Sequence, residues 1–194
     1  MVQSLQLTIK SSVFDKSKIL NIDPEFIELG TKSLTKFEIA ELRYGVEAIR
    51  GYRFNIGRSY CIEIRSVTGT VMKIRLRSLY GIKKKKLGQQ YLLILNTILK
   101  FYIDDICKSF YTKFNNKITF SILGVTFTQQ GILIEKNVDL IDWQDLGVKN
   151  YWSYYSLFSK TNPDKHKIFK YLTDWNTIVV EKLSKHILRE KNLL

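Results

Sequence analysis

The residues that could do chemistry are few in this chain and lie far apart. His166 and His186 are separated by 20 positions, which in one helix is a rise of about 30 Å, so they cannot share a metal ion there. Cys61 and Cys107 have no histidine near them in the sequence. They are typical of inert thiols rather than of a nucleophile or a disulfide framework.

The acidic residues also lack a catalytic pattern. Asp139, Asp142 and Asp145 recur at every third position, but the glycine and the terminal glutamate of a calcium loop are missing. Glu63-Ile64-Arg65 carries arginine where the acid-x-lysine strand of many nucleases has lysine. We therefore expect no enzyme, no catalytic residue, no cofactor and no metal site. A metal-dependent nuclease that uses Glu63 is the enzymatic alternative.

Charge is the strongest chemical signal. The 194 residues have a net charge of +13, which favours an acidic partner such as nucleic acid, anionic lipid or an acidic protein. Between Arg43 and Lys86 there are 12 basic residues and only two acids, Glu47 and Glu63. We predict that these basic residues bind an anionic partner: Arg43, Arg50, Arg53, Arg58, Arg65, Lys73, Arg75, Arg77, Lys83, Lys84, Lys85 and Lys86. A merely solubilising surface is the alternative.

A second candidate surface is aromatic. The segment from Tyr151 to Phe158 would carry aromatic side chains on both faces of a strand. One face can enter the core, whereas the other needs cover from the rest of the chain or from a partner. The possible protein interface consists of Tyr151, Trp152, Tyr154, Tyr155 and Phe158.

Strands in which apolar and polar residues alternate are expected to position the basic residues between 60 and 77. Residues 60–65 and 71–77 each alternate apolar and polar side chains, and Val67-Thr68-Gly69-Thr70 joins them, which predicts a hairpin. Its apolar residues would point inward, namely Ile62, Ile64, Met72, Ile74 and Leu76. Glu63, Arg65, Lys73, Arg75 and Arg77 would then share a solvated outer face.

Amphipathic helices are expected to close each half of the chain. After Gly88, an apolar stripe follows helical spacing, through Leu92, Leu95, Leu99, Tyr102 and Ile106. The second helix should begin with Asn162 as N-cap and Pro163 in the first turn. Its stripe is Leu172, Trp175, Ile178, Val179, Leu183 and Ile187.

Two pairs of segments indicate an internal repeat. Residues 20–29 match residues 125–134, and after a one-residue slip residues 37–42 match 141–146. Tyr91-Leu92 and Leu95-Asn96-Thr97-Ile98 match Tyr171-Leu172 and Trp175-Asn176-Thr177-Ile178. The first copy is longer by about two strands' worth of chain. We predict two domains, residues 1–110, longer and basic, and residues 111–194, shorter and aromatic-rich.

The pattern resembles a tandem pleckstrin-homology-like protein over roughly residues 20–188. Ile39-Ala40-Glu41-Leu42 and Trp143-Gln144-Asp145-Leu146 are similar to a segment common in bacterial members, a family of unknown function. The resemblance implies an α+β fold of two units, each an antiparallel sheet or partial barrel closed by a C-terminal amphipathic helix. It also implies binding of lipid headgroups, peptides or proteins.

These observations lead to one functional expectation and one alternative. We expect a binding or adaptor module that recognises a protein or an anionic partner through the basic face of the first unit. A nucleic-acid-binding protein without sequence preference is the alternative, and an anionic membrane surface is a further possible partner. We expect no signal peptide, because the first residues lack a basic segment and a continuous apolar one, and the longest apolar stretch is residues 91–95, so we expect the chain in the reducing cytoplasm. The oligomeric state is left open.

Overall fold

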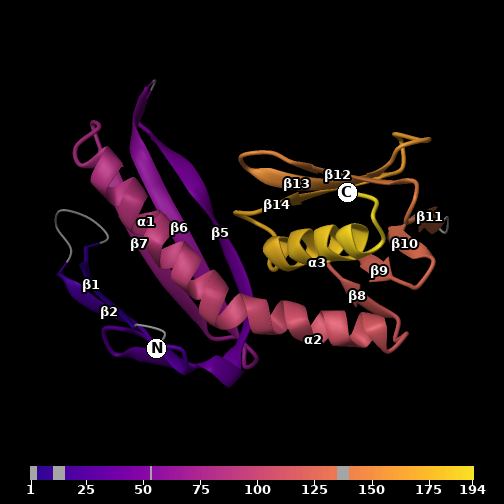
Figure 1. Cartoon of the computed structure of the whole chain (residues 1–194). Coiled ribbons are helices and arrows are strands. Elements are labelled where there is room, and N and C mark those ends of the chain that lie inside the picture. Colours follow the sequence, from indigo (N-terminus) through magenta and orange to yellow (C-terminus); the bar gives the residue numbers. More distant parts are fainter. Residues whose placement is uncertain (1–3, 11–15, 53, 135–139) are drawn as a thin grey trace. The chain divides into compact units, whose positions relative to one another are not determined.

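The chain has an α+β fold, as expected, and divides into two compact units, Met1–Asp104 and Asp105–Leu194. The computed structural model describes residues 4–10, 16–52, 54–134 and 140–194. Figure 1 shows antiparallel sheets and helices in both units. The boundary predicted after residue 110 falls inside a helix that begins at the junction of the two units.

The described part of the first unit contains a four-stranded and a three-stranded antiparallel sheet. The four-stranded sheet contains β1 (Leu5–Ile9), β2 (Lys18–Ile22), β3 (Phe26–Leu29) and β4 (Lys32–Thr35). The 3-10 helix η1 (Lys36–Glu38) leads into the second sheet. That sheet contains β5 (Ile39–Arg50), β6 (Asn55–Ser66) and β7 (Val71–Leu79).

The hairpin predicted over residues 60–77 is confirmed as β6 and β7, which pair antiparallel. All five side chains expected to point inward are buried, because alternate residues of a strand face opposite sides of the sheet. Helix α1 (Lys84–Ile98) packs on these strands. Its buried residues are Tyr91, Ile94, Leu95 and Ile98. The expectation for Leu92 was wrong, since its side chain is exposed and Tyr91 is buried instead, whereas Leu95 and Tyr102 are buried as predicted.

A long helix continues from α1 through the π-helical segment η2 (Leu99–Ile103) into α2 (Asp104–Asn115). Tyr102 of η2 fixes this helix to the four-stranded sheet of the first unit. Its hydroxyl oxygen lies 2.6 Å from the carbonyl oxygen of Asp23 and 2.7 Å from that of Phe26. The phenol therefore donates a hydrogen bond to the turn between β2 and β3, and burial raises its pKa.

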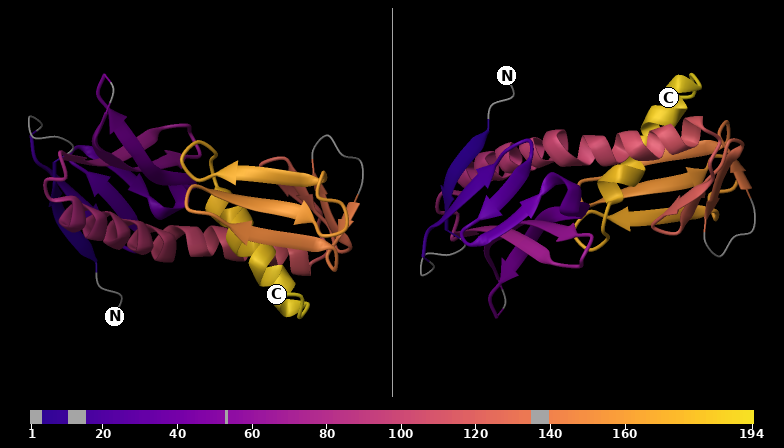
Figure 2. Two further views of the ribbon diagram at one scale, coloured as in Figure 1. Left: turned by 90° about the horizontal axis from the view of Figure 1, so that it is seen from above. Right: turned by 90° about the horizontal axis from the view of Figure 1, so that it is seen from below.

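The described part of the second unit also contains a four-stranded and a three-stranded antiparallel sheet. The first contains β8 (Phe120–Ile122), β9 (Val125–Phe127), β10 (Gly131–Ile134) and β11 (Leu140–Asp142). The second contains β12 (Leu146–Asn150), β13 (Tyr154–Ser159) and β14 (His166–Lys170). Helix α3 (Thr177–Glu190) lies across this second sheet (Figure 2), and Ser184 of α3 shares a 2.6 Å hydrogen bond with the hydroxyl of Tyr155.

The start predicted for the last helix was wrong. Asn162 and Pro163 lie in the loop between β13 and β14, and His166 begins a strand. The Asn162 side chain accepts a hydrogen bond from the Asp164 amide at 3.2 Å, as an asparagine does in a turn as well as at a helix N-terminus. The segment that follows, residues 166–170, pairs with β13 instead of forming a helix.

Of the two pairs of segments matched as a repeat, one lies on equivalent strands of the two units and the other does not lie on equivalent elements. Residues 20–29 lie on β2 and β3 and residues 125–134 on β9 and β10, the second and third strands of their sheets. The other pair is not equivalent, because Tyr91 lies within α1 whereas Tyr171 precedes α3. Among the described residues, the extra length of the first copy does not consist of additional strands. It is strand length, with 12, 12 and 9 residues in β5 to β7 against 5, 6 and 5 in β12 to β14.

None of the helices in the described part of the chain combines the length and the apolar character that crossing a bilayer requires.

Candidate anion-binding surface of the first unit

The predicted basic residues lie in two separate places on the first unit. The first is the outer face of the sheet β5–β7, which we call the charged face. It consists of Glu41, Arg43, Glu63, Arg65, Lys73, Arg75 and Arg77. Strand pairing brings these side chains together, because Arg43 lies opposite Glu63 on one side and Lys73 lies opposite Glu63 on the other.

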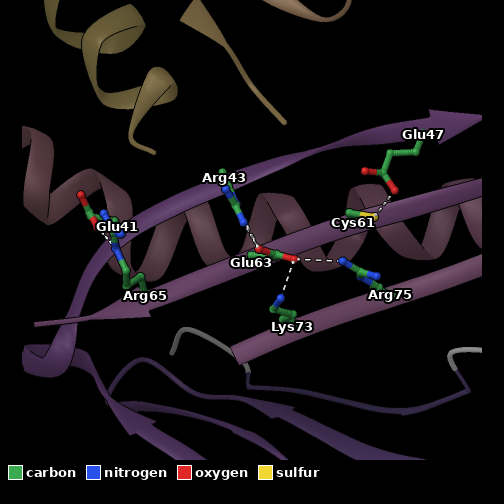
Figure 3. A network of polar contacts seen from close by, with 8 residues as sticks. All are labelled: Glu41, Arg43, Glu47, Cys61, Glu63, Arg65, Lys73 and Arg75. Atoms are coloured by element: carbon green, nitrogen blue, oxygen red, sulfur yellow. Dashed lines mark hydrogen bonds and ion pairs between the residues drawn. The ribbon is translucent and has the colours of Figure 1, made fainter. Parts of the chain in front are cut away.

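Glu63 is the centre of the charged face, and only 5% of its surface is exposed. Arg43 donates to Glu63 Oε2 from Nε at 3.0 Å and from Nη2 at 2.6 Å. Arg75 Nη2 donates to Oε1 at 3.2 Å, and Lys73 Nζ lies 3.7 Å from the same oxygen. Figure 3 shows the carboxylate between these three cations. Charge-assisted hydrogen bonds of this kind are the strong ones in proteins.

Burial opposes ionisation of Glu63, but the hydrogen bonds and charges of Arg43, Arg75 and Lys73 outweigh it and hold its pKa below the ordinary value. Arg65 pairs in the same way with Glu41 of β5. The cations of the charged face are thus partly neutralised within the sheet. The expectation that Glu63 is solvated with its neighbours was wrong, because the long side chains around it enclose it.

The surroundings of Glu63 also bear on the nuclease alternative. A nuclease carboxylate has to bind a cation from solution, whereas Glu63 already contacts two arginines and a lysine. Among the described residues, no group of three or more side chains is suited to hold a metal ion. The aspartates at 142 and 145 lie in a strand and a turn, and Asp139 lies outside the described residues.

Cys61 lies on the charged face between these ion pairs and the exposed carboxylate of Glu47. Burial and the nearby Glu47 raise the pKa of its thiol, and a hydrogen bond with Ser59 offsets this only in part. A raised pKa lowers the thiolate fraction, so Cys61 is a poor nucleophile. The second thiol, Cys107, is half-buried on α2.

The other predicted cations lie at one end of the sheet, where β5 turns into β6 and β7 turns into α1. We call the following exposed residues the basic end: Arg50, Arg58, Lys83, Lys84, Lys85 and Lys86. Arg53 lies outside the described residues. Gly57 of β6 lies opposite Leu79 of β7, and the Tyr80 amide donates to the Ile56 carbonyl at 2.7 Å, so the two turns are neighbours.

An open hollow of about 310 Å³ lies between these two turns. Arg58 and Lys84 contribute cations to its lining, and Asn55, Ser78 and Tyr80 contribute polar groups. The turn that forms it has an unusual backbone, since Tyr80 and Lys83 adopt φ values of 50° and 56°, which non-glycine residues rarely do. The basic end is therefore both more open and less neutralised than the charged face.

The aromatic surface predicted on the second unit is only partly a surface. Tyr155 is buried, with its hydroxyl on Ser184, so it belongs to the core and not to an interface. Trp152 is exposed in the turn before β13, and Tyr151 stacks on Tyr154 with ring centroids 4.3 Å apart. Phe158 is half-buried, and its ring covers Gly147. A protein contact at Tyr151, Trp152, Tyr154 and Phe158 stays a prediction.

The turn that leads to the lysines of the basic end also exposes two large side chains that the sequence did not single out, Tyr80 and Ile82. The signal that could have indicated them is the segment Tyr80-Gly81-Ile82, which breaks the alternation of β7 directly before four lysines.

Comparison with protein families, with curated proteins and with solved structures finds no match to this chain.

Proposed function

We propose that the chain is a non-enzymatic binding or adaptor module of the cytoplasm, built from two pleckstrin-homology-like units. The observation that supports the architecture is its recurrence within the described residues: a four-stranded sheet, a three-stranded sheet and a closing helix in each unit. Equivalent strands of the two units carry matching sequence at residues 20–29 and 125–134. The resemblance in sequence and this order of elements favour the same family.

We further propose that the first unit recognises an anionic partner through the basic end rather than the charged face. The observation that carries this proposal is the distribution of acids. Glu63 and Glu41 neutralise part of the charged face, whereas the sequence has no acidic residue between Glu63 and Asp104. Six exposed cations at one end of a sheet attract phosphate or carboxylate groups and release counterions when these bind.

The test is retention on immobilised heparin, a polyanion that favours neither lipid nor nucleic acid. Lys84→Gln, Lys85→Gln and Lys86→Gln are combined in one variant. The control combines Lys16→Gln, Lys18→Gln and Lys32→Gln, three exposed lysines of the same unit, so both variants lose the same charge. We expect only the first variant to elute at clearly lower salt, because its lysines make the contacts.

Equal elution of both variants would show that net charge alone retains the protein, which contradicts a site at the basic end. No retention of the wild-type protein at low salt would exclude an anionic partner. A protein partner, for which the exposed aromatic residues of the second unit are the candidate surface, would then be the better hypothesis.

A single-stranded nucleic acid is the second candidate partner. The observation in its favour is the exposure of Tyr52 and Phe54 close to Arg50, because unpaired bases stack on aromatic rings beside phosphate-binding cations.

A further inference from the structure

The hairpin turn next to the basic end has a counterpart in the second unit. In the first unit the Gly51 amide donates to the Phe54 carbonyl at 2.8 Å, and in the second the Tyr151 amide donates to the Tyr154 carbonyl at 2.9 Å. Each turn joins the first two strands of a three-stranded sheet. The residue after the donor is aromatic and exposed in both, Tyr52 at 97% and Trp152 at 85%.

In the first unit this turn is part of a larger apolar projection. We call Tyr52, Phe54, Tyr80 and Ile82 the apolar tip. Phe54 is 77% exposed, Tyr80 76% and Ile82 64%. Strand β7 ends opposite Gly57, so the paired residues Arg50 and Asn55 of β5 and β6 lie beyond its end, and in Figure 1 the ends of β5 and β6 project at the same end of the sheet as the start of α1. Large apolar side chains that project from two adjacent turns mark an interaction site.

The chemistry around the apolar tip is cationic. Arg58 and Lys84 line the hollow between the two turns, and Lys83, Lys85 and Lys86 follow on the chain. The hollow, about 310 Å³, is open to solvent and also includes Asn55 and Ser78 in its lining. The tip therefore combines projecting rings with cations set behind them, an arrangement in which rings enter an apolar layer while cations meet its charged rim.

The opposite end of the same sheet provides a comparison within the molecule. Phe37 and Val67 are also exposed there, and their turns are joined by a 2.8 Å hydrogen bond from the Val67 amide to the Glu38 carbonyl. The charged neighbours at this end include the acids Glu38 and Glu41. Apolar exposure is thus common to both ends, and the excess of cations distinguishes the basic end.

We propose that the apolar tip inserts into the interfacial layer of an anionic lipid bilayer while the basic end contacts the headgroups. This inference rests on the proposed anion-binding function and names its partner. Lipid is favoured over nucleic acid because the tip includes the exposed aliphatic Ile82, which has no ring on which a base could stack. Stacking of bases instead uses aromatic rings along a basic groove, whereas Tyr and Trp at the ends of projecting elements suit the bilayer interface.

The first experiment detects insertion directly. Tyr52→Trp is made in a Trp152→Phe background, with Trp152→Phe alone as the control. Both are mixed with vesicles of phosphatidylcholine and phosphatidylserine whose acyl chains are brominated, which quenches tryptophan at short range. We expect extra quenching in the Tyr52→Trp protein. Sedimentation with the vesicles without any extra quenching would overturn insertion.

The second experiment measures how much the rings contribute. Tyr52→Ser with Phe54→Ser should weaken binding to the anionic vesicles about thirtyfold, roughly 2 kcal/mol at 1.4 kcal/mol per tenfold, since each ring transfers part of its surface out of water. Phe37→Ser with Val67→Ser is the matched control and should bind like the wild type. An equal loss in both double variants would overturn the assignment of the tip.

The arms of the test separate the two proposals. Binding to anionic vesicles and not to phosphatidylcholine alone supports both. Binding to a single-stranded oligothymidylate but not to vesicles overturns the lipid inference and leaves an anionic partner. Binding to neither, combined with no retention on heparin, overturns the proposed function itself.

Discussion

Replacing Glu63 by glutamine tests the central feature of the charged face. The substitution keeps the shape of the side chain and removes the charge that Arg43, Lys73 and Arg75 share. Three hydrogen bonds link the arginines to this carboxylate, and each bond to a charged group contributes about 1.5–3 kcal/mol when it is fully desolvated.

The expected loss is smaller than that sum. The side chains of the three cations are 29% to 53% exposed, so solvent screens them, and glutamine keeps one acceptor oxygen. We therefore expect Glu63→Gln to lower the free energy of unfolding by about 2 kcal/mol at neutral pH. Urea denaturation followed by circular dichroism measures this difference.

The same reasoning predicts how the difference in stability between wild type and Glu63→Gln changes with pH. The pKa of Glu63 is lowered in the folded protein, so its contribution is fully present above the unfolded value of about 4.3 and disappears as the pH falls through the folded pKa. The gap between wild type and Glu63→Gln should shrink below about pH 4.3. Glu47→Gln, an exposed acid of the same sheet, should change stability by less than about 0.5 kcal/mol. A variant as stable as the wild type at pH 7, or a gap that does not change with pH, would refute the reasoning.

Three further substitutions test the packing within each unit, with stability measured by thermal or urea denaturation. Tyr102→Phe removes the hydrogen bond from η2 to the β2–β3 turn and should lower the free energy of unfolding by about 1 kcal/mol. An unchanged stability would mean that water in the unfolded chain satisfies the phenol as well as this bond does. Tyr155→Phe leaves the buried Ser184 hydroxyl with its bond to the Val180 carbonyl, so a loss of about 1 kcal/mol is expected, and a larger loss would indicate repacking of α3. Gly57→Ala would place a Cβ 2.2 Å from the Ser78 carbonyl oxygen and should lower the free energy of unfolding by more than about 2 kcal/mol. Gly69→Val is not a comparable substitution, because Gly69 has a positive φ. Wild-type stability of Gly57→Ala would show that β6 and β7 can separate at this position.

The sequence predicted the β6–β7 hairpin well because a two-residue period determines both the strands and their inward residues. It did not predict the environment of Glu63. Alternation places this side chain on the outer face, but only the register shows that Arg43, 20 positions earlier, and Arg75, 12 positions later, reach it. Charge counted along the chain therefore could not show that the acids of β5 and β6 pair with Arg43, Arg65 and Arg75 on this face.

The last helix and the aromatic segment were harder to predict from the sequence for a similar reason. Asn162-Pro163 fits a helix start and a turn equally well, and the choice depends on residues 166–170 finding a partner strand in β13. The run from Tyr151 to Phe158 offers aromatic side chains to both faces, so alternation could not show that Tyr155 would be the one in the core. The basic end was predicted as cationic residues, whereas its hollow depends on two turns that are far apart in the sequence.

The position of Glu63 has a further consequence for how the longest strands of the chain find one another. If β6 slipped by one residue against β5 and β7, Glu63 would turn into the layer occupied by Ile62 and Ile64. An unpaired carboxylate there would cost several kcal/mol, so the misaligned hairpin would be a high-energy state rather than a kinetic trap. The same acid that contributes modestly to the native state thus discourages wrong alignments during folding and strand exchange between molecules.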